Sequence, residues 1–388
     1  MPGHLIFMAA PLCHSLIRHT NGQLSLRYKL TCFKTLLNVY LLTAVISYKI
    51  KLFTKLISMK PGLSKFDYYF NKLQPILTTA AKQKNPALWL YRNDARTPLF
   101  MLEGLAKMYT SFHNKKKFTK IKEHFKLLED TLGAIDYYDS IAKDLGANKK
   151  VPATVIAYLQ AQSREKIQSL NEVLLENDWL LPENSRIDRI REKLQEADWL
   201  EEEKEVDQVH DFYGEAIYEL VEFTQKTNYQ FTNLESGIHE MRRKLRWLSI
   251  YPQALRGTIQ LHTLPKPLKH LTKYLSKEIT TSPFNIMPDV GAAKYVLILE
   301  QNYFFALSWM IAELGRIKDN GLHIIAIKEA LQQAATLTDE AALKKIYPML
   351  GIKQTKLPVL LEQAGNICKT YFKEQNLEHL VTGVNKVK

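Results

Sequence analysis

From Phe66 onward, apolar residues recur at intervals of three and four positions, and strand-like alternation of apolar and polar residues is scarce. This spacing gathers apolar side chains on one face of an α-helix. Glycine and proline fall mainly between the periodic segments and mark predicted breaks at residues 146–152, 181–184, 257, 265–267, 282–288 and 351. The segments between the breaks are roughly 12 to 35 residues long, so the pattern predicts an all-α fold of long antiparallel helices joined by short turns.

Two segments have unusual helix faces. Residues 194–224 carry acidic residues on one side and apolar residues, such as Trp199 and Tyr213, on the other. This predicts one amphipathic helix with a solvated acidic face. Residues 295–314 are apolar nearly all round and are interrupted only at residues 300–302. This favours a buried core helix over a membrane span.

The first 58 residues differ in character from the rest. Their apolar run, residues 36–48, is shorter than the roughly 20 residues that a membrane-spanning helix needs. Met59-Lys60-Pro61-Gly62 reads as a second chain start, and the alternatives for the preceding segment are a membrane-surface anchor or a targeting leader. We therefore interpret residues 1–58 as an extension and residues 59–388 as the folded body, with halves of about 59–225 and 226–388.

Charge is distributed unevenly along the chain. The formal net charge is +13, and the first 58 residues hold seven Lys or Arg residues and no carboxylate. Residues 165–222 hold 18 acidic and 6 basic residues, so the remaining body is strongly positive and suits a polyanionic partner. The spacing of Cys13, Cys32 and Cys368 indicates neither a zinc site nor a disulfide framework, which fits a cytoplasmic protein.

Basic residues form three stripes at helical spacing. The first stripe consists of His239, Arg242, Arg243 and Arg246, at offsets of zero, three, four and seven. The second stripe consists of Lys266, Lys269, His270, Lys273 and Lys277, on a helix predicted to start at residues 265–267. The third stripe consists of His113, Lys117, Lys120 and His124.

Like charges at these offsets repel one another by a few tenths of a kcal/mol per pair, so the stripes slightly destabilise the free helices. A bound polyanion reverses this effect, because phosphate oxygens pair with the guanidinium and ammonium groups and counterions are released. The alternative is that the stripes are ordinary solvated faces, partly paired with the acidic segment of the same molecule.

Standard enzyme signatures are absent from the sequence. There is no Gly-rich phosphate loop, nucleophile elbow, zinc-protease helix or EF-hand loop. Asp207, His210 and Asp211 share a helix face, but acidic helices produce such groups by chance, so we predict no metal site. We expect a protein without cofactor or catalytic activity.

The segment His239-Glu240-Met241-Arg242-Arg243-Lys244-Leu245-Arg246 resembles the signature that opens the second half of the CHAD family, the conserved-histidine α-helical domains. In that signature a histidine precedes Arg and Lys residues at helical spacing. The first-half segment Asn93-Asp94-Ala95-Arg96 is similar and keeps the arginine, but Asn93 stands where the family has histidine.

An internal repeat adds to this resemblance. The segments that begin at Leu132-Gly133 and at Leu314-Gly315 are similar to the Leu-Gly-x-x-x-Asp stretches of the family, with Asp139 and Asp319 as the acidic members. The resemblance covers residues 85–345 in patches. It implies two pseudo-twofold-related helical bundles with a basic surface or groove that binds inorganic polyphosphate without catalysis.

The resemblance assigns polyanion binding to Arg96 and to the stripe of His239, Arg242, Arg243 and Arg246. The other two stripes add Lys266, Lys269, His270, Lys273, Lys117 and Lys120. One alternative is a nucleic-acid-binding protein, which would interleave exposed aromatics such as Trp247, Tyr251 and Tyr274 with its cations. The other is a structural or membrane-surface protein that contacts lipid through residues 1–58.

Overall fold

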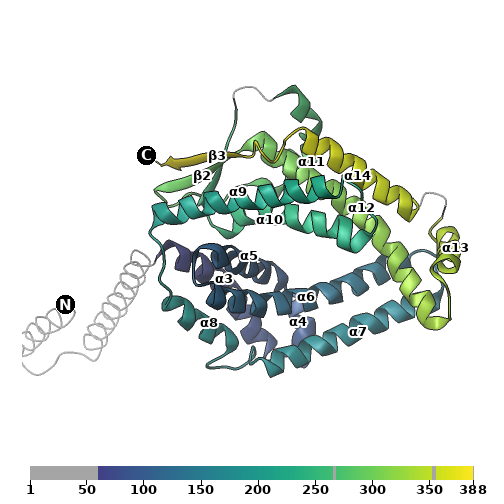
Figure 1. Ribbon diagram of the computed structural model, residues 1–388. Coiled ribbons are helices and arrows are strands. Elements are labelled where there is room, and N and C mark those ends of the chain that lie inside the picture. The colour runs from purple at the N-terminus through teal and green to yellow at the C-terminus, as the bar shows by residue number, and fades with distance from the viewer. Residues whose placement is uncertain (1–59, 265–267, 352–354, 388) are drawn as a thin grey trace, which may run out of the picture. The chain divides into compact units, whose positions relative to one another are not determined.

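The computed structural model describes residues 60–264, 268–351 and 355–387 (Figure 1). It contains 72% helix and 5% strand, which confirms the predicted helical character. The α-helices are α3 (Pro61–Ala80), α4 (Pro86–Arg92), α5 (Arg96–Phe112), α6 (Lys115–Gly146), α7 (Ala153–Glu176), α8 (Arg186–Gln195), α9 (Glu202–Lys226), α10 (Glu240–Ala254), α11 (Lys277–Thr280), α12 (Gln301–Ala334), α13 (Asp339–Leu350) and α14 (Leu357–Lys373).

The predicted breaks agree with the helix boundaries. The break at 146–152 begins at the last residue of α6, and those at 181–184, 257, 282–288 and 351 lie between α-helices. The break at 265–267 lies outside the described residues. Among the described residues, no helix combines the length and the apolar character that crossing a membrane requires.

Helices α3 to α7 pack against one another along the chain, with α5, α6 and α7 as successive neighbours. Their core is rich in aromatic rings, including Phe66, Phe70, Tyr109 and Phe118, all of which are buried because their helices repeat apolar residues every three or four positions. Helix α10 lies against both α5 and α12, and the same hydrophobic cluster continues through these helices to α14.

A small mixed sheet accompanies the helices. It consists of β1 (Ile259–His262), β2 (Tyr295–Glu300) and β3 (Val381–Lys386), with β2 in the centre. Strand β1 pairs with β2 in parallel and β3 pairs with β2 in antiparallel orientation. Helix α9 packs against β2 and β3 (Figure 1).

The sheet corrects the prediction of one helix over residues 295–314. The chain is extended up to Glu300, and α12 begins at Gln301. The Glu300 side chain is 1% exposed and accepts a hydrogen bond from the backbone N–H of Tyr303 at 2.8 Å, so it caps the helix. A short, buried apolar run has the same composition in a strand as in a buried helix, and spacing could not separate the two.

The predicted single helix over residues 194–224 is also wrong. Helix α8 ends at Gln195 and α9 begins at Glu202. Between them, Trp199 turns into the core, is 7% exposed, and donates from Nε1 to the backbone carbonyl of Leu194 at 2.8 Å. Burial of this indole therefore interrupts the periodic segment.

The helix predicted for the second basic stripe is replaced by two shorter elements. Residues Lys269–Tyr274 form a 3₁₀-helix, η2, and Lys277 begins the separate four-residue α11. Leu271 and Tyr274 are the buried positions of η2, at a spacing of three. The second stripe therefore does not lie on one α-helix.

Candidate functional site

The first basic stripe lies at the start of α10. A six-residue π-helix, η1 (Leu234–His239), precedes it, and the Asn233 side chain caps η1 by accepting from the N–H groups of Glu235 and Ser236. Two members of the stripe bind nearby carboxylates. His239 Nδ1 lies 2.7 Å from Glu235 Oε2, and Arg243 Nη2 lies 2.8 Å from Glu240 Oε2.

Arg242 is held by α12. Its Nε donates to the backbone carbonyl of Ile311 at 3.1 Å, and its guanidinium lies against Gly315, where a Cβ would be only 3.0 Å from Nε. The side chain is half-buried. Burial lowers the pKa of Arg242, and the charge of Asp319 partly opposes this shift.

Arg246 continues the stripe one turn later. Its guanidinium carbon lies 4.5 Å from the centroid of the Phe100 ring, which in turn stacks on Trp247 at 4.6 Å. Burial and then the positive charges of Arg242 and Arg96 lower the pKa of Arg246 to about 10. The structure therefore brings these three arginines together.

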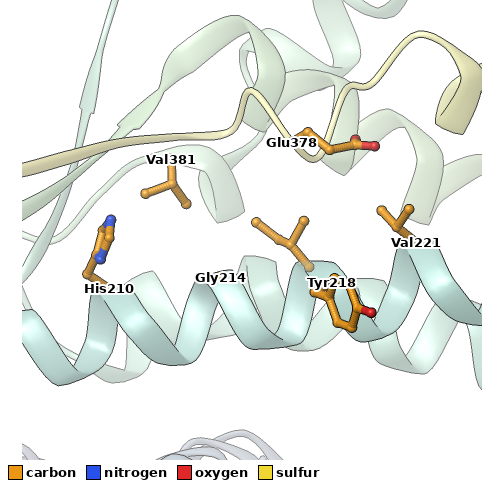
Figure 2. Close-up of a pocket in the computed structure, with 7 residues that line it drawn as sticks. His210, Gly214, Tyr218, Val221, Glu378 and Val381 are labelled. Atoms are coloured by element: carbon orange, nitrogen blue, oxygen red, sulfur yellow. The ribbon is translucent and has the colours of Figure 1, made fainter.

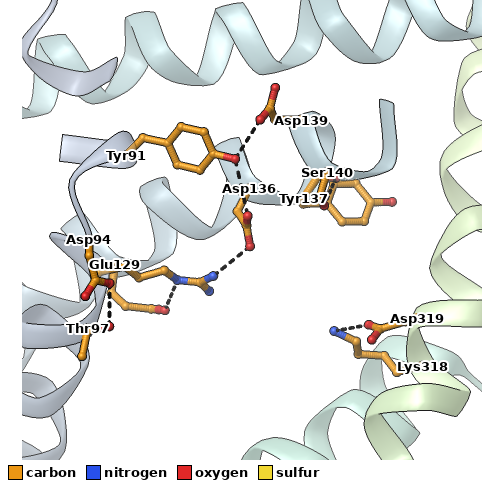
Figure 3. Close-up of polar contacts among 11 residues, drawn as sticks. Tyr91, Asp94, Thr97, Glu129, Asp136, Tyr137, Asp139, Ser140, Lys318 and Asp319 are labelled. Atoms are coloured by element: carbon orange, nitrogen blue, oxygen red, sulfur yellow. Dashed lines mark hydrogen bonds and ion pairs between the residues drawn. The ribbon is translucent and has the colours of Figure 1, made fainter. Parts of the chain in front are cut away.

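Arg96, at the start of α5, approaches the cluster from the first half of the chain. Its Nε lies 2.8 Å from Glu129 Oε1 and its Nη1 lies 3.1 Å from Asp136 Oδ2, both on α6. Its guanidinium lies against Gly133, where a Cβ would be 2.8 Å from Nη2. Figure 3 shows Glu129 and Asp136 in this network.

The network continues beyond Arg96. Tyr91 donates to Asp139 Oδ2 at 2.8 Å, and its hydroxyl also lies 3.5 Å from Asp136. On α12, Lys318 and Asp319 form an ion pair of 3.0 Å (Figure 3). Asp139 and Asp319, the two acidic residues of the internal repeat, are therefore both engaged with side chains of the protein.

Lys107 on α5 adds a cation that the sequence stripes did not include. Its ammonium lies 4.7 Å from the centroid of the Trp247 indole, and it is half-buried. Burial and then the charges of Arg243 and Lys244 lower the pKa of Lys107 to about 8. We name Arg96, Arg242 and Arg246 the arginine cluster, and Lys107 lies beside it, next to Arg243 and Lys244. The sequence carries no signal for Lys107, because its neighbours at helical spacing, Glu103, Gly104, Thr110 and Ser111, carry no positive charge.

The third stripe does not lie on one helix. His113 follows the last residue of α5 and packs among Tyr109, Phe118 and Trp199, whereas Lys117, Lys120 and His124 lie on α6, which begins at Lys115. Lys117 and Lys120 lie on the first turns of α6 and line a groove between α6 and α8. Lys120 is 13 residues before Gly133 on the same helix, about 20 Å along its axis, so these lysines are separate from the arginine cluster.

Members of the second stripe differ in their surroundings. Lys269 and His270 are exposed on η2. Lys273 is bound by Glu374, whose carboxylate also accepts from the Tyr274 hydroxyl at 2.5 Å. Lys266 lies outside the described residues.

A pocket of about 330 Å³ lies along α9 near β3. Figure 2 shows Val381 between His210 and Glu378, the histidine and the carboxylate of its lining. His210 Nδ1 lies 3.4 Å from Asp211 Oδ1, its neighbour in the chain. Over the described ranges, no group of three or more His, Cys, Asp or Glu side chains is arranged to hold a metal ion.

Comparison with protein-family models, with curated proteins and with solved structures found no match.

Proposed function

We propose that this protein binds inorganic polyphosphate or a similar polyanion, without catalysis, through the arginine cluster. The observation that carries this proposal is the crowding of Arg96, Arg242 and Arg246 with incomplete neutralisation. Arg96 is paired with two carboxylates, whereas within the described part of the chain neither Arg242 nor Arg246 forms an ion pair. Half-buried like charges raise one another's free energy, and a bound anion relieves this cost.

The shape of the charged groups suits phosphate. A guanidinium presents a planar fork of N–H donors that matches two phosphate oxygens, and a polyphosphate chain repeats the same charged group along its length. Such a ligand requires a row of cations and no base recognition. Paired His239 and Arg243 then border the site, and Arg242 and Arg246 contact the ligand.

Repetition of one contact in both halves supports the proposed likeness to the CHAD family. Arg96 lies over Gly133 and Arg242 lies over Gly315, and each glycine belongs to one copy of the Leu-Gly repeat. Two halves related by a pseudo-twofold axis would place equivalent arginines over equivalent glycines. We propose such a relationship between residues of about 59–225 and 226–388.

Burial of the aromatic residues disfavours single-stranded nucleic acid as the ligand. Trp247 is 6% exposed and is stacked on Phe100, and Tyr251 and Tyr274 are each 1% exposed. These rings are therefore not accessible for stacking on bases, which is the interaction that single-strand binders use beside their cations.

Retention on immobilised long-chain polyphosphate across a salt series tests the proposal. The full chain and a chain starting at Met59 should both be retained at low salt and released as salt rises, because phosphate contacts displace counterions. An oligonucleotide of equal charge should compete poorly. Failure of both proteins to bind, or full displacement by the oligonucleotide, would contradict the proposal. If only the chain starting at Met59 lost retention, residues 1–58 would be the part that binds. Liposome flotation of the two proteins would then test the membrane alternative.

A further inference from the structure

A second concentration of positive charge lies in the groove between α6 and α8, whose volume is about 440 Å³. Six of the lining residues are Lys or Arg, and the lining contains one carboxylate, that of Glu196. The six are Lys116, Lys117, Lys120, Arg186, Arg189 and Lys193. Three come from each helix, so the cations form two facing walls.

Helical spacing produces both walls. On α6, Lys116, Lys120 and His124 are four residues apart, and on α8, Arg186, Arg189 and Lys193 are three and four apart. Each set therefore lies on one face of its helix. The walls extend about 10–12 Å along the helix axes.

The two walls run antiparallel. Lys117 Nζ donates to the backbone carbonyl of Lys193 at 3.2 Å, which joins the start of α6 to the end of α8. His124, two turns later on α6, interacts electrostatically with Arg186 at the start of α8. Burial and then the charges of Arg186, Lys120, Lys193 and Arg189 lower the pKa of His124 to about 4.

Few protein groups neutralise these cations. Arg189 Nη2 lies 2.8 Å from Asp178 Oδ2, and Arg186 Nε donates to the backbone carbonyl of Asn177 at 2.9 Å, so both arginines are anchored at the groove wall. Across residues 60–264, 268–351 and 355–387, no ion pair is formed by Lys116, Lys120 or Lys193. The Arg189 Nε atom is buried and has no hydrogen-bond partner there. With Glu196 and Asp178 counted, the groove has four more positive than negative charges.

We propose that this groove is a second anion site, which binds a linear oligophosphate of about three phosphates, either free or as part of a longer chain. Two facing rows of cations surround a narrow, multiply charged anion on both sides, and each phosphate then contacts both walls. The lining includes Ile121 and Ile190 and no aromatic ring, so it offers no surface for stacking a base. This site is independent of the arginine cluster, because its lysines on α6 lie 13 or more residues, about 20 Å along the helix axis, before Gly133.

This groove cannot be identified from the total charge of residues 165–222. Residues 165–222 are strongly acidic overall, and Arg186, Arg189 and Lys193 are three of their six basic residues. Helix α8 places these three on one face, so a segment with net negative charge presents a positive wall to α6.

Calorimetric titration of the full chain with tripolyphosphate tests this proposal. The parent protein should bind tripolyphosphate in the groove, and Lys120→Ala with Lys193→Ala should weaken binding at this site about tenfold through loss of two charge-assisted contacts. Both lysines are exposed, so the variant should keep the parent's circular dichroism and Tm. The matched control is Lys82→Ala with Lys84→Ala, two exposed lysines outside both sites, which should leave the affinity unchanged.

Two further arms separate this site from the arginine cluster and identify the source of the phosphates. Arg242→Gln with Arg246→Gln should retain tripolyphosphate binding, so failure of the proposed function would leave this result intact. Displacement of tripolyphosphate by long-chain polyphosphate supports binding of a chain segment, and absence of displacement supports a free oligophosphate. No binding by the parent protein, or equal weakening by the Lys120 and Lys82 pairs, would overturn the proposal.

Discussion

The guanidinium of Arg242 lies against Gly315, so close that a Cβ on that residue would be only 3.0 Å from Nε, tighter than an ordinary contact. Arg96 has the same relationship to Gly133. Each glycine therefore provides a flat position on a long helix, α12 or α6, over which an arginine from a neighbouring helix can extend. This arrangement holds both guanidinium groups at the arginine cluster.

Gly315→Ala should weaken polyphosphate retention more than it changes stability. Its methyl group would be 3.0 Å from Arg242 Nε, so the flexible arginine shifts by a few tenths of an ångström and its hydrogen bond to Ile311 is weakened. Alanine stabilises a helix by about 1 kcal/mol relative to glycine, which offsets the displacement. We expect a change in unfolding free energy within about 1 kcal/mol and a several-fold loss of retention. Unchanged retention would mean that the position of Arg242 is unimportant for binding.

Gly321→Ala provides the contrast on the same helix. Its methyl group would be 2.8 Å from both terminal carbons of Leu234, a buried core residue that cannot move into solvent. Overpacking of this kind costs about 1–3 kcal/mol. Urea denaturation should show this decrease in unfolding free energy. The folded fraction should be retained on polyphosphate as well as the parent is. A stability equal to that of Gly315→Ala would contradict the packing described for η1 and α12.

Lys65 and Glu205 form a buried ion pair between α3 and α9, with exposed fractions of 6% and 1%. Glu205 also accepts from the Tyr109 hydroxyl at 2.6 Å. Lys65→Ala should reduce the unfolding free energy by about 3–5 kcal/mol, because it leaves the carboxylate buried without its cation. The double variant Lys65→Met with Glu205→Leu should recover part of this loss. If the single variant were as stable as the parent in urea, the pair would contribute nothing to the core.

His124 should make stability depend on pH. Its pKa is about 4 in the folded protein, against an ordinary value of 6.5, so the unfolded chain binds a proton in this interval that the folded chain does not. The unfolding free energy therefore falls as the pH is lowered from about 6.5 to 4. His124→Gln removes this contribution, and after allowance for solvent screening it should be about 1 kcal/mol more stable than the parent near pH 4.5.

The parent and His124→Gln contain the same other titrating groups. Contributions of those groups therefore cancel in the difference between the two unfolding free energies. Denaturant unfolding at pH 7.5 and 4.5 gives the difference in unfolding free energy between the two proteins, which should be near zero at pH 7.5. A pH-independent difference would show that His124 does not sense the cations of the groove. Addition of tripolyphosphate should raise the pKa of His124, as measured by NMR, because the anion offsets their charge.

The helical class could be predicted from sequence because the apolar spacing of three and four recurs over long segments such as those that form α6 and α12. The same reasoning failed for residues 295–314 and 194–224, as it did for the second basic stripe. Glu300 caps α12 only because a strand precedes it, and Trp199 separates α8 from α9 only because its ring is buried by distant helices. Both depend on tertiary contacts that spacing does not encode.

The candidate sites were partly visible in the sequence. Offsets placed Arg242 and Arg246 on one helix, and pairing of His239 with Glu235 and of Arg243 with Glu240 was detectable as helical spacing of opposite charges. The contact of Arg246 with Phe100 could not be predicted from the sequence, because it joins segments far apart in the chain. The η2 residues show the opposite outcome, since a regular spacing of cations did not produce an α-helix there.

Retention of paired charge-reversal variants on polyphosphate tests the central proposal most directly. Arg242→Glu with Arg246→Glu should reduce retention at low salt by about tenfold or more, whereas Lys149→Glu with Lys150→Glu, in the exposed connection between α6 and α7, should reduce it little. Arg242→Gln with Arg246→Gln, checked for native circular dichroism, controls for misfolding and should also weaken retention. Equal losses in the arginine and lysine pairs would show that diffuse charge, and not the arginine cluster, holds the polyanion.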